Sequence, residues 1–285
     1  MSFFRKMFGR APEPESAEPE SAATPQGRTP TGTSLAVLLE RLPESLNEMA
    51  REFPARLPAL GAVDLGRETP DEPTFPAMME VGGHSVWALG FDLPMPEEAQ
   101  KRSIFYSNWN DEAKAPLYAH RAHVLLFYQG GSDDPVVQLS VLYALAAGMR
   151  PLGVADETAF NGVPAAVLHE AGSAEFLQAA QTDIPSLLWT GVLKFHREDG
   201  QTWYATRGFE RFGKPNLAFL APTGQGEQAT DLFHTLLNCQ HFYHQTFAHG
   251  HTAELGGQFL RFADPYEYAE YLSGGHPVLT VSADS

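Results

Sequence analysis

A buried strand followed directly by a buried helix is the feature that most constrains how this chain can fold. Val124 to Tyr128 is a continuous apolar run of strand-forming residues, which is typical of a strand covered on both faces. Ser132 to Pro135 supplies a capping side chain, acidic residues and a proline, and so predicts a helix start. Pro135 to Ala147 is apolar on more than one side, which predicts an interior helix, and Leu152 to Ala155 predicts another short strand.

The residues before Met78 are predicted to lie outside the ordered domain. Residues 1–34 include a long stretch rich in Pro, Glu, Ser, Thr and Gly, which predicts a disordered tether. From Ser34 onward leucines recur at helical spacing, and Pro43 predicts a break in that helix. Residues 35–77 are therefore interpreted as a helix and an irregular linker.

Residues 78–285 mix strands and helices, which predicts an α+β fold with a mixed or antiparallel sheet. The part from 78 to 182, with a predicted strand at Ile104 to Trp109, follows the strand–helix–strand–strand–helix–strand order of a ferredoxin-like fold. The part from 183 to 285 has more strands per helix. The sequence predicts a ferredoxin-like first half packed on a strand-rich second half, as one body or two packed subdomains.

The charge balance limits the classes of partner. The chain has 35 acidic and 19 basic residues, a net charge of -16. This argues against nucleic acid, because nucleic-acid affinity comes mainly from Lys and Arg on phosphates, and against adsorption to anionic lipid. The acidity favours a soluble cytoplasmic protein, or one with a basic protein partner.

Cysteine content and hydropathy also favour a cytoplasmic protein. The single cysteine, Cys239, excludes an intrachain disulfide, and no apolar run approaches the ~20 residues of a membrane-spanning helix. The sequence thus predicts a cytoplasmic location without stable membrane insertion.

A histidine cluster in and after the longest predicted helix is the first candidate site. Zinc accepts imidazole and thiolate ligands, but Cys239 lies about 160 degrees from His241 around the helix. The pattern also lacks a Cys-x-x-Cys pair and the His-Glu-x-x-His spacing. Structural or solvated histidines are the favoured interpretation. The alternative is a metal site formed by His241, His244, His249 and His251. The cluster comprises His234, Cys239, His241, His244, His249 and His251.

A basic turn, Thr206 to Pro215, is the second candidate. Its cations Arg207, Arg211 and Lys214, together with two glycines, are residue types that bind anions through side chains and backbone amides. The turn lacks the spacing of a phosphate loop or a dinucleotide site. The favoured interpretation is a strand-to-strand corner whose cations meet the protein's own carboxylates.

No catalytic set is predicted. His120 and His123 adjoin the buried strand, and satisfied core histidines are the favoured interpretation of both. No Gly-x-Ser-x-Gly nucleophile elbow occurs. The sequence also predicts no cofactor, and it leaves the oligomeric state open.

Several short motifs occur in a fixed order between roughly Glu80 and Val281. They are Pro94-Met95-Pro96, Trp109, His120-Arg121-Ala122-His123, Leu188-Trp189, Thr206-Arg207-Gly208, Phe212-Gly213-Lys214-Pro215 and Gly250-His251-Thr252. In this order they resemble the bacterial family called domain of unknown function 4261. The resemblance implies a bacterial cytosolic α+β protein and supplies no established reaction. The chain departs from the family pattern at His251, where an acidic residue is expected.

The leading functional hypothesis is a non-catalytic protein-interaction module of adaptor or immunity type. It follows from the acidic charge, the predicted tether and the absence of a catalytic motif. Two alternatives stay open: a metal-dependent enzyme that uses the C-terminal histidines, and a small-anion sensor at the basic turn.

Overall fold

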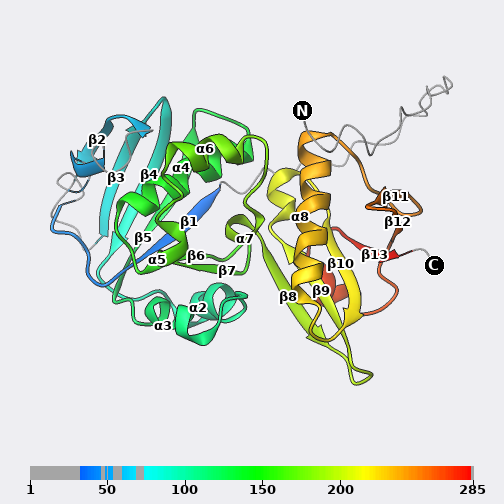
Figure 1. Ribbon diagram of the computed structural model, residues 1–285. Coiled ribbons are helices and arrows are strands. Elements are labelled where there is room, and N and C mark those ends of the chain that lie inside the picture. The colour runs from blue at the N-terminus through cyan, green and yellow to red at the C-terminus, as the bar shows by residue number, and fades with distance from the viewer. Residues whose placement is uncertain (1–32, 46–48, 50, 54–59, 69–73, 284–285) are drawn as a thin grey trace.

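The protein has two β-sheets covered by helices, which confirms the predicted α+β class (Figure 1). The computed structural model describes residues 33–45, 49, 51–53, 60–68 and 74–283. The predicted tether of residues 1–34 lies outside the described residues except for Thr33 and Ser34. We call residues 33–182 the first half and residues 183–283 the second half.

The first half is built on a seven-stranded sheet in which every pair of neighbours is antiparallel. The order across the sheet is β2 (Val63–Glu68), β3 (Thr74–Val81), β4 (His84–Phe91), β5 (Ala122–Gly130), β1 (Ser34–Leu39), β6 (Gly153–Asp156) and β7 (Asn161–Pro164).

Strand β1 lies between β5 and β6 and is antiparallel to both, so β5 and β6 run parallel to each other. Helix α4 (Pro135–Gly148) makes the crossover between them and is almost entirely buried, as the sequence predicts. With β1 between them, β5, α4 and β6 form a split βαβ unit, which is half of a ferredoxin-like fold. Strand β4, the fourth strand of the order β4-β5-β1-β6, follows β2 and β3 along the chain as their antiparallel neighbour.

The helix predicted from Ser34 is wrong, because this segment is the central strand β1. Leu35, Val37 and Leu39 face one apolar core, and Ala36 and Leu38 face the other. A strand buried on both faces is apolar at every position, so its leucines also match a helical period. The predicted linker of residues 35–77 supplies β1, β2 and half of β3 to the sheet.

The strand predicted at Ile104 to Trp109 is also wrong. The chain there forms α2 (Glu97–Gln100), a π-helical turn η3 (Lys101–Phe105) and α3 (Asp111–Tyr118). These helices place Met95, Ile104 and Leu117 over β1 and β6. Helices α4, α5 (Ala165–Leu168) and α6 (Ala174–Ala180) cover the opposite face (Figure 1).

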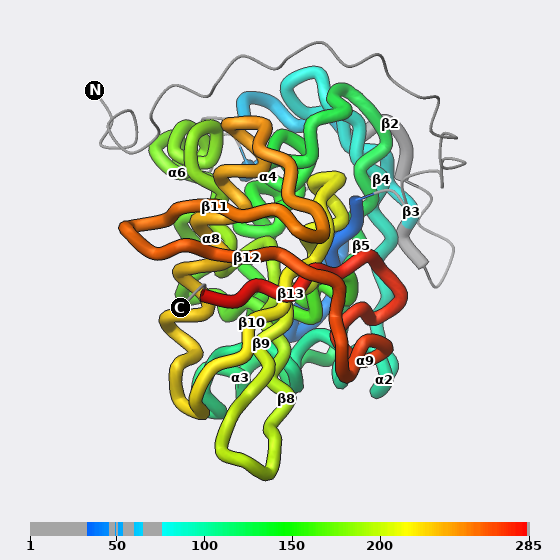
Figure 2. Tube along the Cα trace, turned by 90° about the vertical axis from the view of Figure 1, so that its right-hand side faces the viewer, coloured from blue at the N-terminus to red at the C-terminus, as the bar shows by residue number. Residues whose placement is uncertain are grey.

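The second half contains a six-stranded sheet whose strand β13 lies parallel to β10, while the other neighbours are antiparallel. Figure 2 shows the hairpin β11–β12 and strand β13 at the end of the molecule that this half forms. The order is β11 (Thr252–Leu255), β12 (Gln258–Ala263), β13 (Val278–Ala283), β10 (Asn216–Pro222), β9 (Gln201–Arg207) and β8 (Gly191–His196).

Helices cover both faces of this second sheet. Helix α8 (Gly226–Phe242) packs its buried Phe233 and Leu236 into the core shared with the first half. The short helix α9 (Ala269–Ser273) covers the other face, where Leu272 contacts the cluster around Trp203. None of the helices within the described ranges has the length and apolar character needed to cross a membrane.

The two halves are joined by one continuous apolar core around α7 (Ser186–Trp189), which lies between them (Figure 1). Trp189 is fully buried with its ring 6.2 Å from that of Tyr143 on α4. The Tyr143 hydroxyl donates to the carbonyl of Leu188 at 2.5 Å. The last strand of the first sheet ends at Pro164 and the first strand of the second begins at Gly191. A division at 182/183 into independent subdomains stays a prediction.

Replacing Leu38 by Ala should lower the free energy of unfolding by about 2–5 kcal/mol, because it opens a cavity in a fully buried position of β1. Leu93→Ala, at a half-exposed position, is the control and should change it by less than about 0.5 kcal/mol. Urea unfolding followed by circular dichroism measures both. If Leu38→Ala and Leu93→Ala both changed the free energy of unfolding by the same small amount, β1 would not be part of the packed sheet.

Candidate functional site

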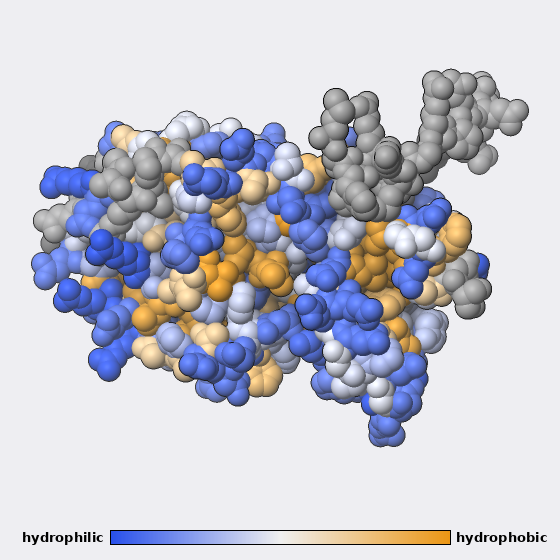
Figure 3. All heavy atoms as spheres, in the orientation of Figure 1, coloured by the Kyte–Doolittle hydropathy of each residue, from blue (hydrophilic) through white to orange (hydrophobic). Residues whose placement is uncertain are grey.

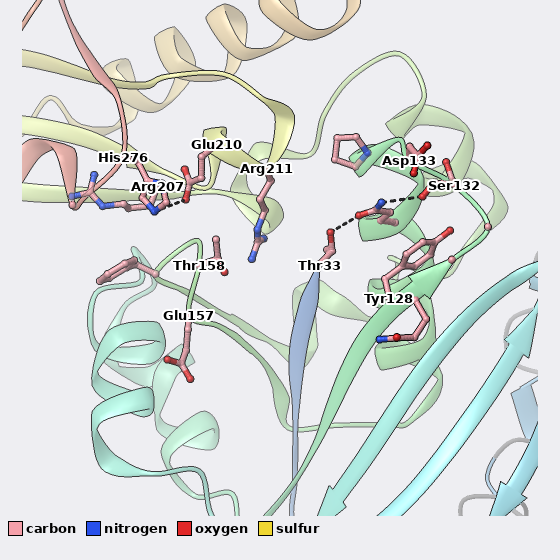
Figure 4. Close-up of a pocket in the computed structure, with 17 residues that line it drawn as sticks. Thr33, Tyr128, Ser132, Asp133, Glu157, Thr158, Arg207, Glu210, Arg211 and His276 are labelled. Atoms are coloured by element: carbon pink, nitrogen blue, oxygen red, sulfur yellow. Dashed lines mark hydrogen bonds and ion pairs between the residues drawn. The ribbon is translucent and has the colours of Figure 1, made fainter. Parts of the chain in front are cut away.

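A cleft of about 760 Å³ lies between the two halves (Figure 4). The carboxyl ends of the parallel strands β5 and β6 meet at one edge of the first sheet, so the loops that follow them both open into this cleft. Tyr128, Ser132 and Thr158 line it from the first half. The second half contributes the turn after β9, and so the cleft contains part of the basic turn predicted to bind anions.

Arg211 reaches from that turn toward the end of β6 and forms a buried ion pair with Asp156. Both guanidinium Nη atoms donate to the carboxylate, and the side chains are 8% and 0% exposed. Burial by itself lowers the pKa of Arg211, but the adjacent Asp156 outweighs it and raises that pKa. The charge of Arg211 is thus neutralised inside the protein, as the corner interpretation expects.

Arg207 is 97% buried, at 3% exposure, and holds helix α9 in place. Its Nη1 donates to the carbonyls of Thr206 and Leu272, and its Nη2 donates to the carbonyl of Tyr271, each at 2.8 Å. A cation at the carboxyl end of a helix is favourable because the last carbonyls carry partial negative charge. Burial lowers the pKa of Arg207, while Glu210 opposes that change.

The Nε of Arg207 has no hydrogen-bond partner among the described residues. Gly274 packs over it, since a Cβ built on that glycine would lie 2.8 Å from Nε. A residue with a side chain would not fit at position 274, where φ is +55°. Nε therefore faces the backbone of the protein itself.

Lys214, the third predicted cation, does not line the cleft, and acts electrostatically on His241 instead. Acidic side chains share the cleft with the two arginines. The arrangement brings Arg207 and Arg211 together, but most of their donors already bind the protein. The acidic residues are Asp133, Glu157 and Glu210.

The four histidines predicted as metal ligands have separate surroundings. His241 lies beside Asp134 at 4.0 Å, and burial lowers its pKa although Asp134 opposes that effect. His249 contacts Asp264 at 3.1 Å, His251 contacts the carbonyl of Thr246, and His244 is exposed beyond α8. Across the part of the chain that the structure describes, no three His, Cys, Asp or Glu side chains form a group that could hold a metal ion.

His120 and His123 are buried and hydrogen-bonded to the backbone, which agrees with the core interpretation. His120 Nε2 accepts from the Met95 N–H at 2.9 Å, so its proton must lie on Nδ1, which donates to the Leu117 carbonyl at 2.5 Å. His123 Nδ1 donates to the Leu93 carbonyl at 2.8 Å. Burial lowers the pKa of both imidazoles, although these carbonyls oppose it.

The outer face of the first sheet carries a row of apolar side chains that α2, η3 and α3 do not cover. Met78, Trp87 and Phe127 are register partners across β3, β4 and β5, and Leu89 pairs with Leu125 beside them. Leu125 is half-buried at the margin of this row, where it packs against the cluster under the helices. Trp87 is 40% exposed and Met78 is 38% exposed. We call these five residues the outer patch. A hollow of about 290 Å³ adjoins it, lined in part by Leu125 and Phe127.

The outer patch departs from the usual pattern of an antiparallel sheet with one face in water. Such strands normally alternate buried apolar residues with outward polar residues. Here Val86 and Ala88 are buried on the inner face, yet Trp87 and Leu89 point outward between them. This surface is not apparent from the sequence, because apolar residues at both alternating positions look like a fully buried strand.

Figure 3 shows the side of the molecule on which the helices of the first half lie, where apolar side chains are interspersed with hydrophilic ones over both halves.

No family model, curated protein or solved structure matches this chain. The resemblance to domain of unknown function 4261 therefore stays a prediction, and function has to be argued from the chain's own residues.

Replacing Arg211 by Met should lower the free energy of unfolding by about 3–5 kcal/mol, because Asp156 is left charged and buried without its partner. The double variant Arg211→Met/Asp156→Asn should recover part of that loss, since an Asn side chain still accepts the Thr158 and Ala159 amides. A double-mutant cycle from urea unfolding measures the coupling. A coupling energy near zero would contradict a buried pair.

Lowered histidine pKa values also make stability depend on pH. Because the folded pKa values of His120 and His123 lie below the ordinary value of about 6.5, the unfolded chain binds more protons as pH falls through that value. The free energy of unfolding should fall from pH 7 toward pH 5. His120→Gln should make the slope smaller by at most about 1.4 kcal/mol per pH unit. Urea unfolding at several pH values measures the slope of the free energy of unfolding against pH. Identical slopes for the unchanged protein and His120→Gln would refute this linkage.

Proposed function

We propose that this protein is a cytoplasmic protein-interaction module that binds a partner protein through the outer patch. The observation that carries the proposal is Trp87, which is 40% exposed at the centre of an apolar row on the part of the outer sheet face that no described helix covers. Exposed contiguous apolar surface on a folded protein marks an interaction site, whereas single exposed apolar residues do not.

The composition of the outer patch suits an interface. Aromatic residues and Met are enriched at the centres of protein–protein interfaces, and Trp is prominent among the side chains that carry most of the binding energy. Trp87 and Phe127 lie side by side, with ring centroids 6.2 Å apart. The neighbouring hollow gives a partner's side chain a place to insert, beside rings whose positions the sheet fixes.

Charge indicates the kind of partner. The net charge of -16 attracts a basic protein and raises its association rate. Glu80 lies next to the outer patch on β3, where it accepts hydrogen bonds from the Ser85 hydroxyl. A complementary surface would combine an apolar centre with Lys or Arg at its rim.

The two alternatives from the sequence have weaker support. The four C-terminal histidines have separate partners, and the cations of the basic turn largely bind the protein's own carboxylate and carbonyl groups. The outer patch, by contrast, is a contiguous row whose Met78 and Trp87 are exposed and are covered by no element within the described residues.

Trp87→Ser should weaken partner binding at least tenfold, because it removes the largest exposed ring of the outer patch. Phe259→Ser on β12 of the second sheet, 56% exposed, is the matched control and should leave binding unchanged. Quantitative affinity capture from the native cytosol identifies the partner, and titration of the purified pair at low and high salt gives the two dissociation constants. A basic partner should bind more weakly at high salt.

The proposal is abandoned if no partner is captured, or if Trp87→Ser and Phe259→Ser bind it as tightly as the unchanged protein. Thermal unfolding of both variants shows whether a loss of binding reflects the surface or a loss of the fold.

A further inference from the structure

A serine, a histidine and an aspartate lie in a hydrogen-bonded series where the two halves meet. Ser186 is the first residue of α7, and His234 lies midway along α8. The Ser186 hydroxyl oxygen is 3.0 Å from His234 Nδ1, and His234 Nε2 is 3.0 Å from Asp183 Oδ1. None of these residues forms part of the outer patch or of the interhalf cleft.

The aspartate determines which imidazole nitrogen carries the proton. Two side chains lie within hydrogen-bond distance of His234 Nε2: Asp183 Oδ1 at 3.0 Å, which can only accept, and Asn238 Nδ2 at 3.2 Å, which can only donate. The nearer, charged Asp183 favours the proton on Nε2, because a hydrogen bond to a carboxylate is the stronger of the two. Nδ1 is then unprotonated and accepts a hydrogen bond from the Ser186 hydroxyl. This is the arrangement by which a base activates a serine, with the two ring nitrogens in the opposite roles from those of the serine proteases.

A fourth side chain fixes the aspartate in this position. Asn238, one helical turn after His234, donates from Nδ2 to Asp183 Oδ1 at 2.6 Å. Its Oδ1 accepts from the backbone N–H of Ile184 at 2.9 Å. Helix α8 therefore carries the base and also holds the segment that presents the aspartate and the serine.

Ser186 lines a small cavity of about 100 Å³ beside the series. Trp109 and Val192 give this cavity apolar walls. Asn108 also lines it and donates from its Nδ2 to the Val192 carbonyl at 3.0 Å. An amide nitrogen has two hydrogens, so the second one is able to stabilise negative charge on a substrate oxygen.

We propose that Ser186 is the nucleophile of a hydrolytic site for esters of small acyl groups, with His234 as general base and Asp183 as its positioning residue. The Ser186 oxygen bonds to the acyl carbon while its proton passes to His234 Nδ1. The bond to the alcohol oxygen then breaks, and that alcohol leaves with the proton from His234.

A water molecule completes the reaction. It bonds to the acyl carbon of the serine ester and gives its proton to His234, which returns the proton to the Ser186 oxygen as the acid is released. The balance is ester plus water giving acid plus alcohol, with no other reactant. The small cavity limits the acyl group to about the size of acetyl.

The test uses the full chain and two probes, 4-nitrophenyl acetate and an alkyl fluorophosphonate. The unchanged protein should hydrolyse the acetate at least 100-fold faster than Ser186→Ala. It should also gain the mass of one phosphonyl group, located on Ser186 by peptide mapping. His234→Gln should lose both properties.

Matched control variants distinguish hydrolysis at Ser186 from ester hydrolysis by other histidines of the protein. His249 also contacts an aspartate but has no serine beside it, so His249→Gln should keep full activity. Ser186→Cys keeps a nucleophile beside His234 and should transfer the labelling to iodoacetamide even if Ser186→Ala does not fold.

Asp183→Asn tests the positioning role, because an amide can donate to Nε2 and move the imidazole proton to Nδ1. Its kcat for the acetate should fall at least 100-fold while KM stays unchanged, because the base is misplaced but the cavity is intact. Unchanged activity in Ser186→Ala, or no adduct on Ser186, overturns the proposal. Neither result bears on partner binding at Trp87, which lies in the first sheet.

Discussion

The position of β1 between β5 and β6 is the constraint on which the rest of the molecule depends. Because β1 is antiparallel to both neighbours, β5 and β6 run parallel, and the chain needs a long crossover to join them. The buried α4 provides that crossover and occupies one face of the sheet. The loops after β5 and β6 then emerge at the same edge, which forms one wall of the interhalf cleft.

This geometry also explains how the second half is attached. The junction combines an apolar contact around Trp189 with the ion pair between Asp156 and Arg211. A buried ion pair contributes little net stability, but separating its members inside the protein is costly. The pair consequently favours one orientation of the halves. His234 of α8 and Ser186 of α7 both belong to the second half, so their contact forms within that half.

Local patterns in the sequence predict the core unit well. The continuous apolar run at β5, the cap before Pro135 and the apolar character of α4 identify these elements and their burial. The same patterns fail at β1, since Leu35, Leu38 and Leu39 satisfy a helical period and a doubly buried strand equally well. Only the pairing with β5 and β6, which is distant in sequence, distinguishes the two.

The sites depend still more on distant contacts. The corner interpretation of Arg211 follows from charge alone, but its partner Asp156 is 55 residues away. In the sequence His234 belongs to a histidine cluster, whereas its hydrogen-bond partner Ser186 lies 48 residues earlier. No spacing rule connects either pair, because the Asp156–Arg211 contact forms only when the two halves pack and the Ser186–His234 contact forms only when α8 packs beside α7.

The acidic charge and the exposed outer patch are compatible for a physical reason. An uncovered apolar sheet face would ordinarily promote self-association. A net charge of -16 opposes the approach of a second copy, because like charges repel at the distance where the apolar surfaces would begin to touch. A basic partner meets the opposite field and is drawn toward the same face. The net charge thus disfavours self-association through Trp87 and favours binding of a basic partner. Specificity therefore depends on the charge of the whole chain as well as on the outer patch.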